Sequence, residues 1–353
     1  MDRTVAAANR DPDCAGLAGT LPIAFVRDFV QLVGDELDLG ETLRRAGIPA
    51  GLVADDRSRV TIEQASRVVR GIWQMTGDEI LGLGHHAMQR GTFRMLAIGL
   101  VHTPDLVAAL KRLCEFSSVI PAMPTVRSDE VDGQVRVWLD VEEAGLDETG
   151  LGQDLSAVLL LAVVQRFASW LVSRRVDALC VELPGKQPAD SAHLDLVFGA
   201  PLQFNAAAPA LRLDQALMSA PVTQDEASLE VYLAQCPAVW LSRRDFGTTL
   251  NDRVRRVLLR RSISDWPSHD ELARAMAMSA PTLRRRLRDQ GTSVAEMKDE
   301  IRRDMAIESL SLGEESVSDL ADRLGFSEPS AFHRAFRRWT GQAPGVYRSS
   351  AVS

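Results

Sequence analysis

The stretch SVSDLADRLGFSEPSAFHRAFRRWTGQAPGVYR, from Ser316 to Arg348, decides the fold of the last third of this 353-residue chain. Ser316 and Asp319 have the spacing of a capping box, in which a serine begins a helix and an acidic residue bonds back to it. After a turn at a glycine, Phe332 and Phe336 lie four residues apart, on one face of a second helix. The pattern therefore predicts a helix, a turn and a second helix, which together form a helix-turn-helix unit.

The same pattern occurs about 48 residues earlier, in SHDELARAMAMSAPTLRRRLRDQG, from Ser268 to Gly291. Ser268 and Glu271 again have the capping-box spacing. Leu283 and Leu287 take the places that the two phenylalanines have in the later copy. The repeat predicts two helix-turn-helix units in one all-α domain.

The second helix of each unit has a basic outer face. A helix turns about 100° per residue, so Arg285 points away from Leu283 and Leu287, and Arg334 points away from the two phenylalanines. The side chains beside these two arginines are Arg284 and Arg288 in the first unit and Ser330, His333 and Arg337 in the second. Arginine bonds guanine in the major groove, and serine and histidine can also bond base edges. The pattern predicts that double-stranded promoter DNA is the partner.

A long helix is expected between the two units, supported by Met297, Ile301, Met305 and Leu312 and ending near Gly313. About 20 helical residues span about 30 Å, close to one turn of DNA. One chain could then engage two successive segments of the major groove. Arg302 and Arg303 on this helix are expected to contact phosphates or solvent.

Charge is unevenly distributed along the chain. The whole chain has a formal net charge of −8, but residues 240–353 contain 20 Lys and Arg against 16 Asp and Glu. The rest has 20 basic and 32 acidic residues, so the carboxy-terminal part is the better candidate for contact with phosphates. The four cysteines form no CxxC pair, and no apolar run is long enough to span a membrane. These features favour a cytoplasmic protein with no membrane partner.

The amino-terminal part is predicted to be an α+β domain. Helices are expected over 23–37, 61–77, 103–120 and 155–172, and strands over 134–143, 176–183, 198–206 and 209–214. The predicted organisation is a disordered tail over 1–20, a sensing and dimerisation domain over 21–224, a linker over 225–240 and the helical domain over 241–353.

Sites in the amino-terminal part are less marked. His85, His86 and His102 lack the regular spacing of metal ligands, and His193 with Asp195 has no accompanying nucleophile. No nucleotide-binding glycine motif is present. We therefore predict no catalytic residue, no metal and no cofactor. The residues chosen for a test of contact with a small-molecule effector are Trp73, Arg94 and Trp138, because aromatic and guanidinium groups suit an apolar pocket with an anionic anchor.

The helical repeat resembles the AraC/XylS family of bacterial regulators over about 266–348. The resemblance lies in Leu320-Ala321, Gly325-Phe326, the two phenylalanines, and a Gly-x-x-Pro-x-x-Tyr-Arg ending at Gly341, Pro344, Tyr347 and Arg348. It implies base contacts at Pro281, Arg284 and Arg285 and at Ser330, His333 and Arg334. Pro281 has no side-chain donor, unlike the residues often found there in the family.

The amino-terminal part is similar to the arabinose-binding-like effector domain of one branch of that family. The similar stretches are LPIAFVRDFV at 21–30, HTPDLVAALKRLCEF at 102–116 and HLDLVFGAPLQFNA at 193–206. The expected function is transcription regulation with an unknown effector, a possible homodimer, and contact with RNA polymerase if the protein activates. The alternatives are an enzyme fused to a DNA-binding module and a protein adaptor that no longer reads DNA.

Overall fold

Alternating apolar residues build the sheet of the amino-terminal half in the computed structural model, which describes residues 19–32, 38–80, 86–140, 151–187, 198–242, 250–313 and 315–348. Val135, Val137 and Leu139 are buried, while Arg136 and Trp138 between them lie on the opposite face. In spatial order the strands are β3 (Thr125–Val131), β4 (Gln134–Asp140), β7 (Ala210–Asp214), β5 (Ala178–Glu182) and β6 (Leu202–Gln203).

The sheet is antiparallel except for its β5–β6 pair. β3 and β4 form a hairpin in which Thr125 lies opposite Asp140, and Asp132 and Gly133 at its tip both have positive φ. A two-residue loop with this backbone matches the twist of the strands that it joins. The sequence predicted β4 to β7 but missed β3, because most of its side chains are exposed and polar and show no alternation.

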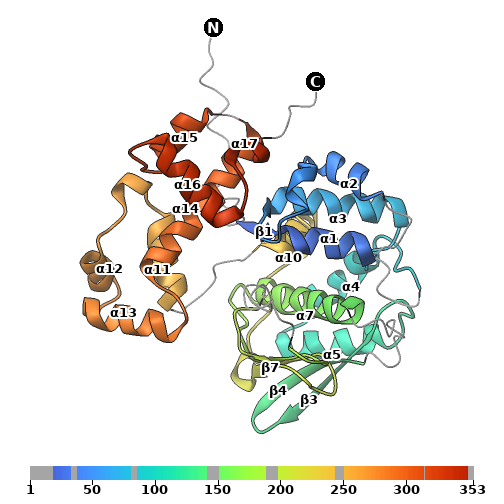
Figure 1. Ribbon diagram of the computed structural model, residues 1–353. Coiled ribbons are helices and arrows are strands. Elements are labelled where there is room, and N and C mark those ends of the chain that lie inside the picture. Colours follow the sequence, from blue (N-terminus) through green and yellow to red (C-terminus); the bar gives the residue numbers. More distant parts are fainter. Residues whose placement is uncertain are drawn as a thin grey trace. The chain divides into compact units, whose positions relative to one another are not determined.

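Helices cover the buried face of this sheet (Figure 1). α7 is apolar almost all round, as expected for a buried helix. The helices of this part are α3 (Ile62–Thr76), α4 (Thr92–Val101), α5 (Leu106–Ser117), α7 (Leu151–Leu171), α9 (Glu226–Ala234) and α10 (Ala238–Leu241), with one 3-10 turn, η4 (Gln215–Leu217). α9 and α10 occupy the predicted linker over 225–240. They are ordered here because Asp225 and Ser228 form a capping box and Tyr232 and Val239 are buried.

Glu182 bridges two arginines on the other face of the sheet. Its carboxylate accepts a hydrogen bond from Arg136 Nε at 2.9 Å and another from Arg212 Nε, and its side chain is only 5% exposed. Burial by itself raises the pKa of this carboxyl. The hydrogen bonds from Arg212 and Arg136 outweigh burial, and the pKa lies below its usual value of 4.5.

We expect Glu182→Gln to lower the free energy of unfolding by about 1–3 kcal/mol at pH 7, because two arginines lose their charged acceptor. The depressed pKa means that this contribution is complete above pH 4.5 and is lost as pH falls through the folded-state pKa. Urea unfolding at several pH values should therefore show a smaller deficit for the variant in acid. Glu130→Gln, an exposed glutamate on β3 that accepts a bond from Gln215, is the matched control. An equal deficit for Glu182→Gln at every pH would contradict the assignment.

The chain divides into two compact units that do not follow its linear order. One unit contains Asp28–Asp38 and Ser66–Leu241. The other contains Ser242 to the end together with the stretch before Asp28 and Leu39–Ala65, so the division falls within α1 and α3. This division differs from the predicted single domain over 21–224, because Leu39–Ala65 and the stretch before Asp28 belong to the other unit. Of the predicted tail, 1–18 lie outside the described residues and Thr20 begins a strand.

The second unit is mainly helical, with a two-stranded sheet contributed by the amino-terminal stretches. Its amino-terminal elements are β1 (Thr20–Pro22), α1 (Ile23–Leu32, up to Arg27), α2 (Leu39–Ala46), η3 (Ala50–Leu52) and β2 (Arg59–Thr61). Its carboxy-terminal elements are α11 (Leu250–Leu259), η5 (Ile263–Asp265), α12 (His269–Ala275), α13 (Ala280–Asp289), α14 (Val294–Leu312), α15 (Val317–Arg323), α16 (Pro329–Thr340) and α17 (Pro344–Tyr347). The fold class is confirmed: an α+β part precedes a helical part with two helix-turn-helix units joined by a long helix.

Candidate nucleic-acid interface

The first helix-turn-helix unit consists of α12 and α13. Ser268 begins α12 through the predicted capping box, because Glu271 Oε2 accepts a bond from the backbone N–H of Ser268 at 2.8 Å. Ser279 caps α13. Leu283 and Leu287 are fully buried in a cluster with residues of α11, α12 and α14, so one face of α13 is held against the domain.

The second unit consists of α15 and α16. Ser316 caps α15, although the returning bond runs from its hydroxyl to Asp319 Oδ2 at 2.7 Å rather than from its backbone N–H. Phe332 and Phe336 are fully buried, with ring centroids 5.6 Å apart. The two phenylalanines hold α16 as the two leucines hold α13.

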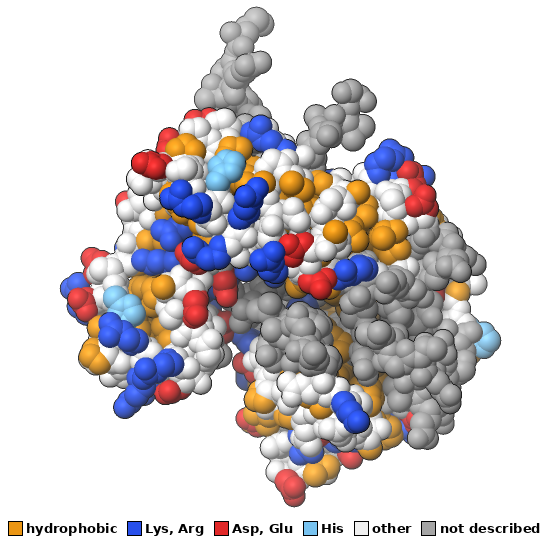
Figure 2. All heavy atoms as spheres, viewed as in Figure 1, with side chains coloured by type: hydrophobic (Ala, Val, Ile, Leu, Met, Phe, Trp, Pro, Cys, Tyr) orange, Lys and Arg blue, Asp and Glu red, His pale blue; other side chains and the backbone are white. Residues whose placement is uncertain are grey.

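The opposite faces of both helices are exposed and basic. Arg285 and Arg334 are exposed, as the helical geometry predicted. Figure 2 shows Lys and Arg side chains over both regions where Figure 1 draws α13 and α16. Within the described residues, no hydrogen bond or ion pair engages the exposed side chains of Arg284, Arg285, Arg286, Arg288, Arg334 and Arg337.

The neighbouring site residues differ in what they can offer. His333 is exposed, and its ring forms a T-shaped pair with that of the buried Phe332 at a centroid distance of 6.2 Å. Ser330 Oγ donates to Glu328 Oε2 at 3.1 Å, so this hydroxyl already has a local partner. Pro281 is exposed in the first turn of α13, where it fits the helix but brings no donor.

α14 joins the two units. It begins at the cap Ser293 and ends at Gly313, whose φ of 69° is the left-handed conformation that closes many helices. Its 19 residues span about 28 Å. Arg302 and Arg303 were expected to contact phosphates or solvent, but both bind inside the protein. Arg302 donates to the carbonyl of Leu324 at 3.2 Å, and Arg303 pairs with the adjacent Asp304 at 3.1 Å.

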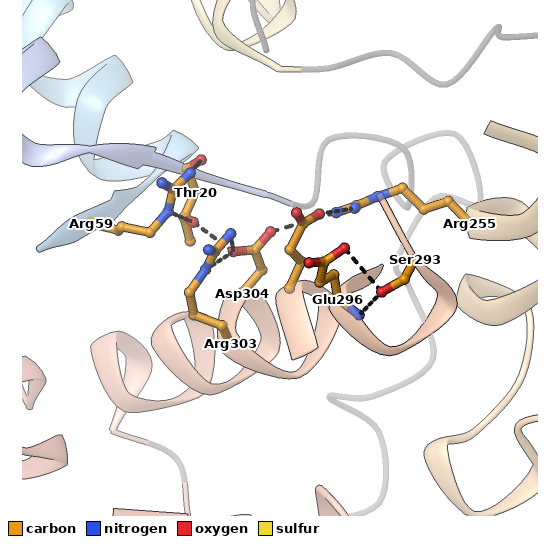
Figure 3. A network of polar contacts seen from close by, with 8 residues as sticks. Thr20, Arg59, Arg255, Ser293, Glu296, Arg303 and Asp304 are labelled. Carbon is orange, nitrogen blue, oxygen red and sulfur yellow. Dashed lines mark hydrogen bonds and ion pairs between the residues drawn. The ribbon is translucent and has the colours of Figure 1, made fainter. Parts of the chain in front are cut away.

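A polar network ties the amino-terminal strands to α14 (Figure 3). Thr20 Oγ1 donates to Asp304 Oδ1 at 2.6 Å and accepts from Arg59 Nε at 2.7 Å. Arg255 of α11 donates to Glu300, which is also on α14, at 2.8 Å. Burial, together with the nearby Arg303, lowers the pKa of Arg59 to about 10, so this guanidinium stays charged at neutral pH.

The carboxy-terminal end of the domain is also covered by the amino-terminal stretch. Tyr347 is fully buried, and its hydroxyl accepts a bond from the backbone N–H of Arg59 at 3.0 Å. Gly341 has a φ of 74°, and a Cβ there would lie 2.0 Å from Asp55 Oδ2. No local sequence pattern predicts this packing. The Tyr-Arg ending marks Tyr347 as part of the family pattern, but the pattern does not indicate which distant segment buries its ring.

The three residues chosen for effector contact lie apart. Trp73 donates from Nε1 to the carbonyl of Glu79 at 3.0 Å, Arg94 pairs with Glu230 at 2.6 Å, and Trp138 stacks with Arg127 and Arg136 on the face of the sheet opposite its buried side. None of the three lines the apolar cavity that lies between this sheet and helices α4, α5 and α7. Effector contact by these residues stays a prediction.

Metal chemistry finds no support among the described residues, since no three of their His, Cys, Asp and Glu side chains gather as ligands would. His102 pairs instead with Glu226 at 2.8 Å. His85, His193 and Asp195 lie outside the described residues. None of the helices in the described ranges has the length and hydropathy that crossing a membrane requires.

Comparison with known families decides the relationship. The model of the arabinose-binding domain of AraC transcription regulators matches residues 37–222, just over half of the chain, and a helix-turn-helix domain model matches 272–350. The chain belongs to the AraC family of transcription regulators. The model that matches the amino-terminal part describes a domain of transcription regulators rather than of enzymes, so the interpretation as a fused enzyme is set aside.

Individual relatives of this AraC-family chain agree. The ornithine utilization regulator of Pseudomonas aeruginosa is 30% identical over 202 residues, which cover 57% of this chain and 59% of that protein. The HTH-type transcriptional regulator VqsM of the same species is 39% identical over 99 residues, 28% of this chain and 30% of that protein. The chain thus spans less than two thirds of these relatives. The crystal structure of the transcriptional regulator CdpR from Pseudomonas aeruginosa aligns over 72% of this chain and 82% of its own, with 24% identity and a TM-score of 0.28.

Proposed function

We propose that this AraC-family chain binds promoter DNA sequence-specifically by placing α13 and α16 in successive segments of the major groove. The supporting observation is the pair of exposed arginine arrays, which have no partner among the described residues and stand on helices anchored by buried leucines and phenylalanines. Arginine side chains are mostly exposed in folded proteins, and no acid among the described residues holds the guanidinium groups of these arrays. These are left available for an external anion.

The roles of the individual side chains follow from their places on the two helices. Arg284, Arg285, His333 and Arg334 point outward and are assigned to base edges, where arginine can bridge O6 and N7 of guanine. Arg288 and Arg337 lie one turn further along and are assigned to phosphates, which set position rather than sequence. Pro281 and Ser330 complete the face at the start of each helix, and they contribute shape and one hydroxyl.

The length of α14 supports reading of two groove segments by one chain. Its span of about 28 Å is close to the roughly 34 Å that separates equivalent groove positions one turn apart. A DNA site for one chain is therefore expected to contain two half-sites about one turn apart.

Modulation by an effector is the second part of the proposal. The family model of the effector domain begins at residue 37, yet Leu39–Ala65 belong to the same compact unit as α13 and α16. Arg59 donates to Thr20, and Thr20 donates to Asp304 on α14, the helix that sets the separation of the two reading helices. A change in the amino-terminal domain therefore has a direct physical route to the DNA-reading helices.

Selection of a binding site from random double-stranded DNA by the full-length protein tests this function. We expect enrichment of a bipartite sequence, and an affinity that falls steeply with salt, by roughly 10³-fold between 50 and 200 mM if about six phosphates are contacted. Fluorescence anisotropy with the selected duplex gives the measurement. Failure to enrich any sequence, with binding insensitive to salt, would instead favour a protein adaptor that does not read DNA.

A further inference from the structure

An apolar cavity lies in the unit that contains Ser66–Leu241, between the sheet and its covering helices. Its volume is about 120 Å³, and its walls come from α4, α5, α7, strands β3, β4 and β7, and Trp240 of α10. A cavity of roughly 150 Å³ with similar walls is known to hold a benzene molecule. Interiors are otherwise packed almost without voids larger than a water molecule, so a space of this size is unusual for a core.

The polar atoms in the wall are already paired with other protein atoms. The carboxylate of Glu79 accepts from the backbone N–H groups of Gly91 and Phe93, at 2.6 and 2.8 Å. The other two polar side chains bond outside the cavity: Thr92 Oγ1 donates to the carbonyl of Gln89 at 2.7 Å, and Trp240 Nε1 donates to the Tyr232 hydroxyl at 3.1 Å. Among the described lining residues, none therefore has an unpaired N–H or O–H group to offer a ligand.

This wall discriminates between classes of ligand. A sugar would bury several hydroxyl groups without partners, and each such group costs free energy. A carboxylate would meet the negative charge of Glu79 and no cation, because no Lys or Arg is among the described lining residues and the predicted anchor, Arg94, pairs with Glu230. An uncharged hydrocarbon group loses nothing by entering and gains contact with the rings of Phe93, Phe167 and Trp240.

We propose that this cavity is the effector site and that the effector is a small uncharged apolar molecule, of the size of one aromatic ring or a short hydrocarbon chain. The proposal rests on the proposed function, because it names the ligand through which DNA binding is modulated. It differs from the sugar that the name of the matched family model suggests.

Trp240 connects the cavity to the rest of the chain. Its ring packs edge-on against Phe93 and Trp73, with centroids 5.1 and 5.8 Å apart. α10 ends one residue later at Leu241. The next described helix along the chain, α11, belongs to the other compact unit, the one that contains α13 and α16 and is called the DNA-binding unit below. An occupant of the cavity thus touches the last helix before the chain enters that unit.

The test uses the full-length protein with toluene as the probe, and benzoate and L-arabinose as charged and polar comparisons. Binding is measured by calorimetry, and the dissociation constant of the selected DNA duplex is measured with and without each probe. Ala168→Leu and Ala109→Leu fill the cavity from α7 and α5, whereas Met123→Leu keeps its volume and serves as the matched control. Thermal unfolding without probe shows which variants remain folded.

Of the three probes, we expect only toluene to bind. Its binding should change the dissociation constant of the DNA duplex by at least about fivefold. Both effects should be lost in at least one folded filling variant and kept in Met123→Leu. Binding of arabinose or benzoate in place of toluene, or no binding of toluene, would overturn the ligand class while wild-type DNA binding still stands. Toluene binding that leaves DNA affinity unchanged would overturn the assignment as the effector site. Absence of specific DNA binding without any probe is a failure of the proposed function itself.

Discussion

Replacement of both Arg285 and Arg334 by alanine is expected to weaken binding of the selected DNA site by about 2–6 kcal/mol, roughly 30- to 20,000-fold. A bidentate arginine–guanine contact contributes about 1–3 kcal/mol of discrimination. The two arginines lie on different helices and share no partner within the described residues, so their effects should add. Anisotropy titrations of the two single variants and the double variant on the selected duplex give the numbers.

Arg338→Ala is the matched control for that experiment. Arg338 is on the same helix as Arg334 but pairs with Asp299 at 3.2 Å, so its loss should change affinity for the selected site much less. Binding to an unrelated duplex should fall only slightly in the double variant, because phosphate contacts provide most of it. A double variant that keeps both wild-type affinity and wild-type sequence preference would refute the base-reading role of these residues.

Phe336→Ala is expected to lower the free energy of unfolding of the DNA-binding unit by about 3–5 kcal/mol. The ring is fully buried, its centroid 5.6 Å from that of Phe332 and 5.1 Å from that of Tyr347, and alanine would leave a cavity beside these two aromatic rings. Because this ring packs the buried face of α16 against the rest of the unit, specific DNA binding should be lost at temperatures where the unit is partly unfolded.

Urea unfolding followed by circular dichroism measures this effect, with the two compact units analysed as separate transitions. Phe336→Leu, which keeps most of the apolar volume, should cost clearly less than Phe336→Ala. A loss below about 1 kcal/mol for Phe336→Ala would mean that α16 is held mainly by other contacts.

The helical part of the fold could be predicted from the sequence because its signals are local. Caps such as Ser268, the spacing of Leu283 and Leu287, and a glycine that ends a helix all act within a few residues of one another. The outward direction of Arg285 and Arg334 follows from helix geometry alone. Arg286, which follows Arg285 on α13, is exposed as well.

The contacts that could not be predicted join residues distant in the sequence. Thr20 bonds Asp304, and Arg59 bonds Tyr347, across more than 280 positions. A threonine and an arginine on short strands have no periodic pattern that names such partners. The sequence assigned Arg303 to phosphate or solvent for a different reason: its partner is the adjacent Asp304, and side chains next to each other on a helix are not expected to face one another.

The residues predicted to contact an effector illustrate a second limit of prediction from the sequence. Residue type suggested Trp73, Arg94 and Trp138, but the apolar cavity is lined mostly by Leu, Val and Phe that a sequence presents as ordinary core. Trp138 follows Val137 on β4, so strand alternation puts its ring on the opposite face of the sheet from the cavity. Alternation could have signalled this, but only with knowledge of which face the helices cover.

Hydroxyl-radical footprinting of the full-length protein on its selected DNA site tests the central claim most directly. Two protected segments about one helical turn apart are predicted, with Arg285→Ala weakening one of them and Arg334→Ala the other. A single protected segment, or two segments that both variants weaken equally, would contradict the account in which α13 and α16 read separate parts of the groove.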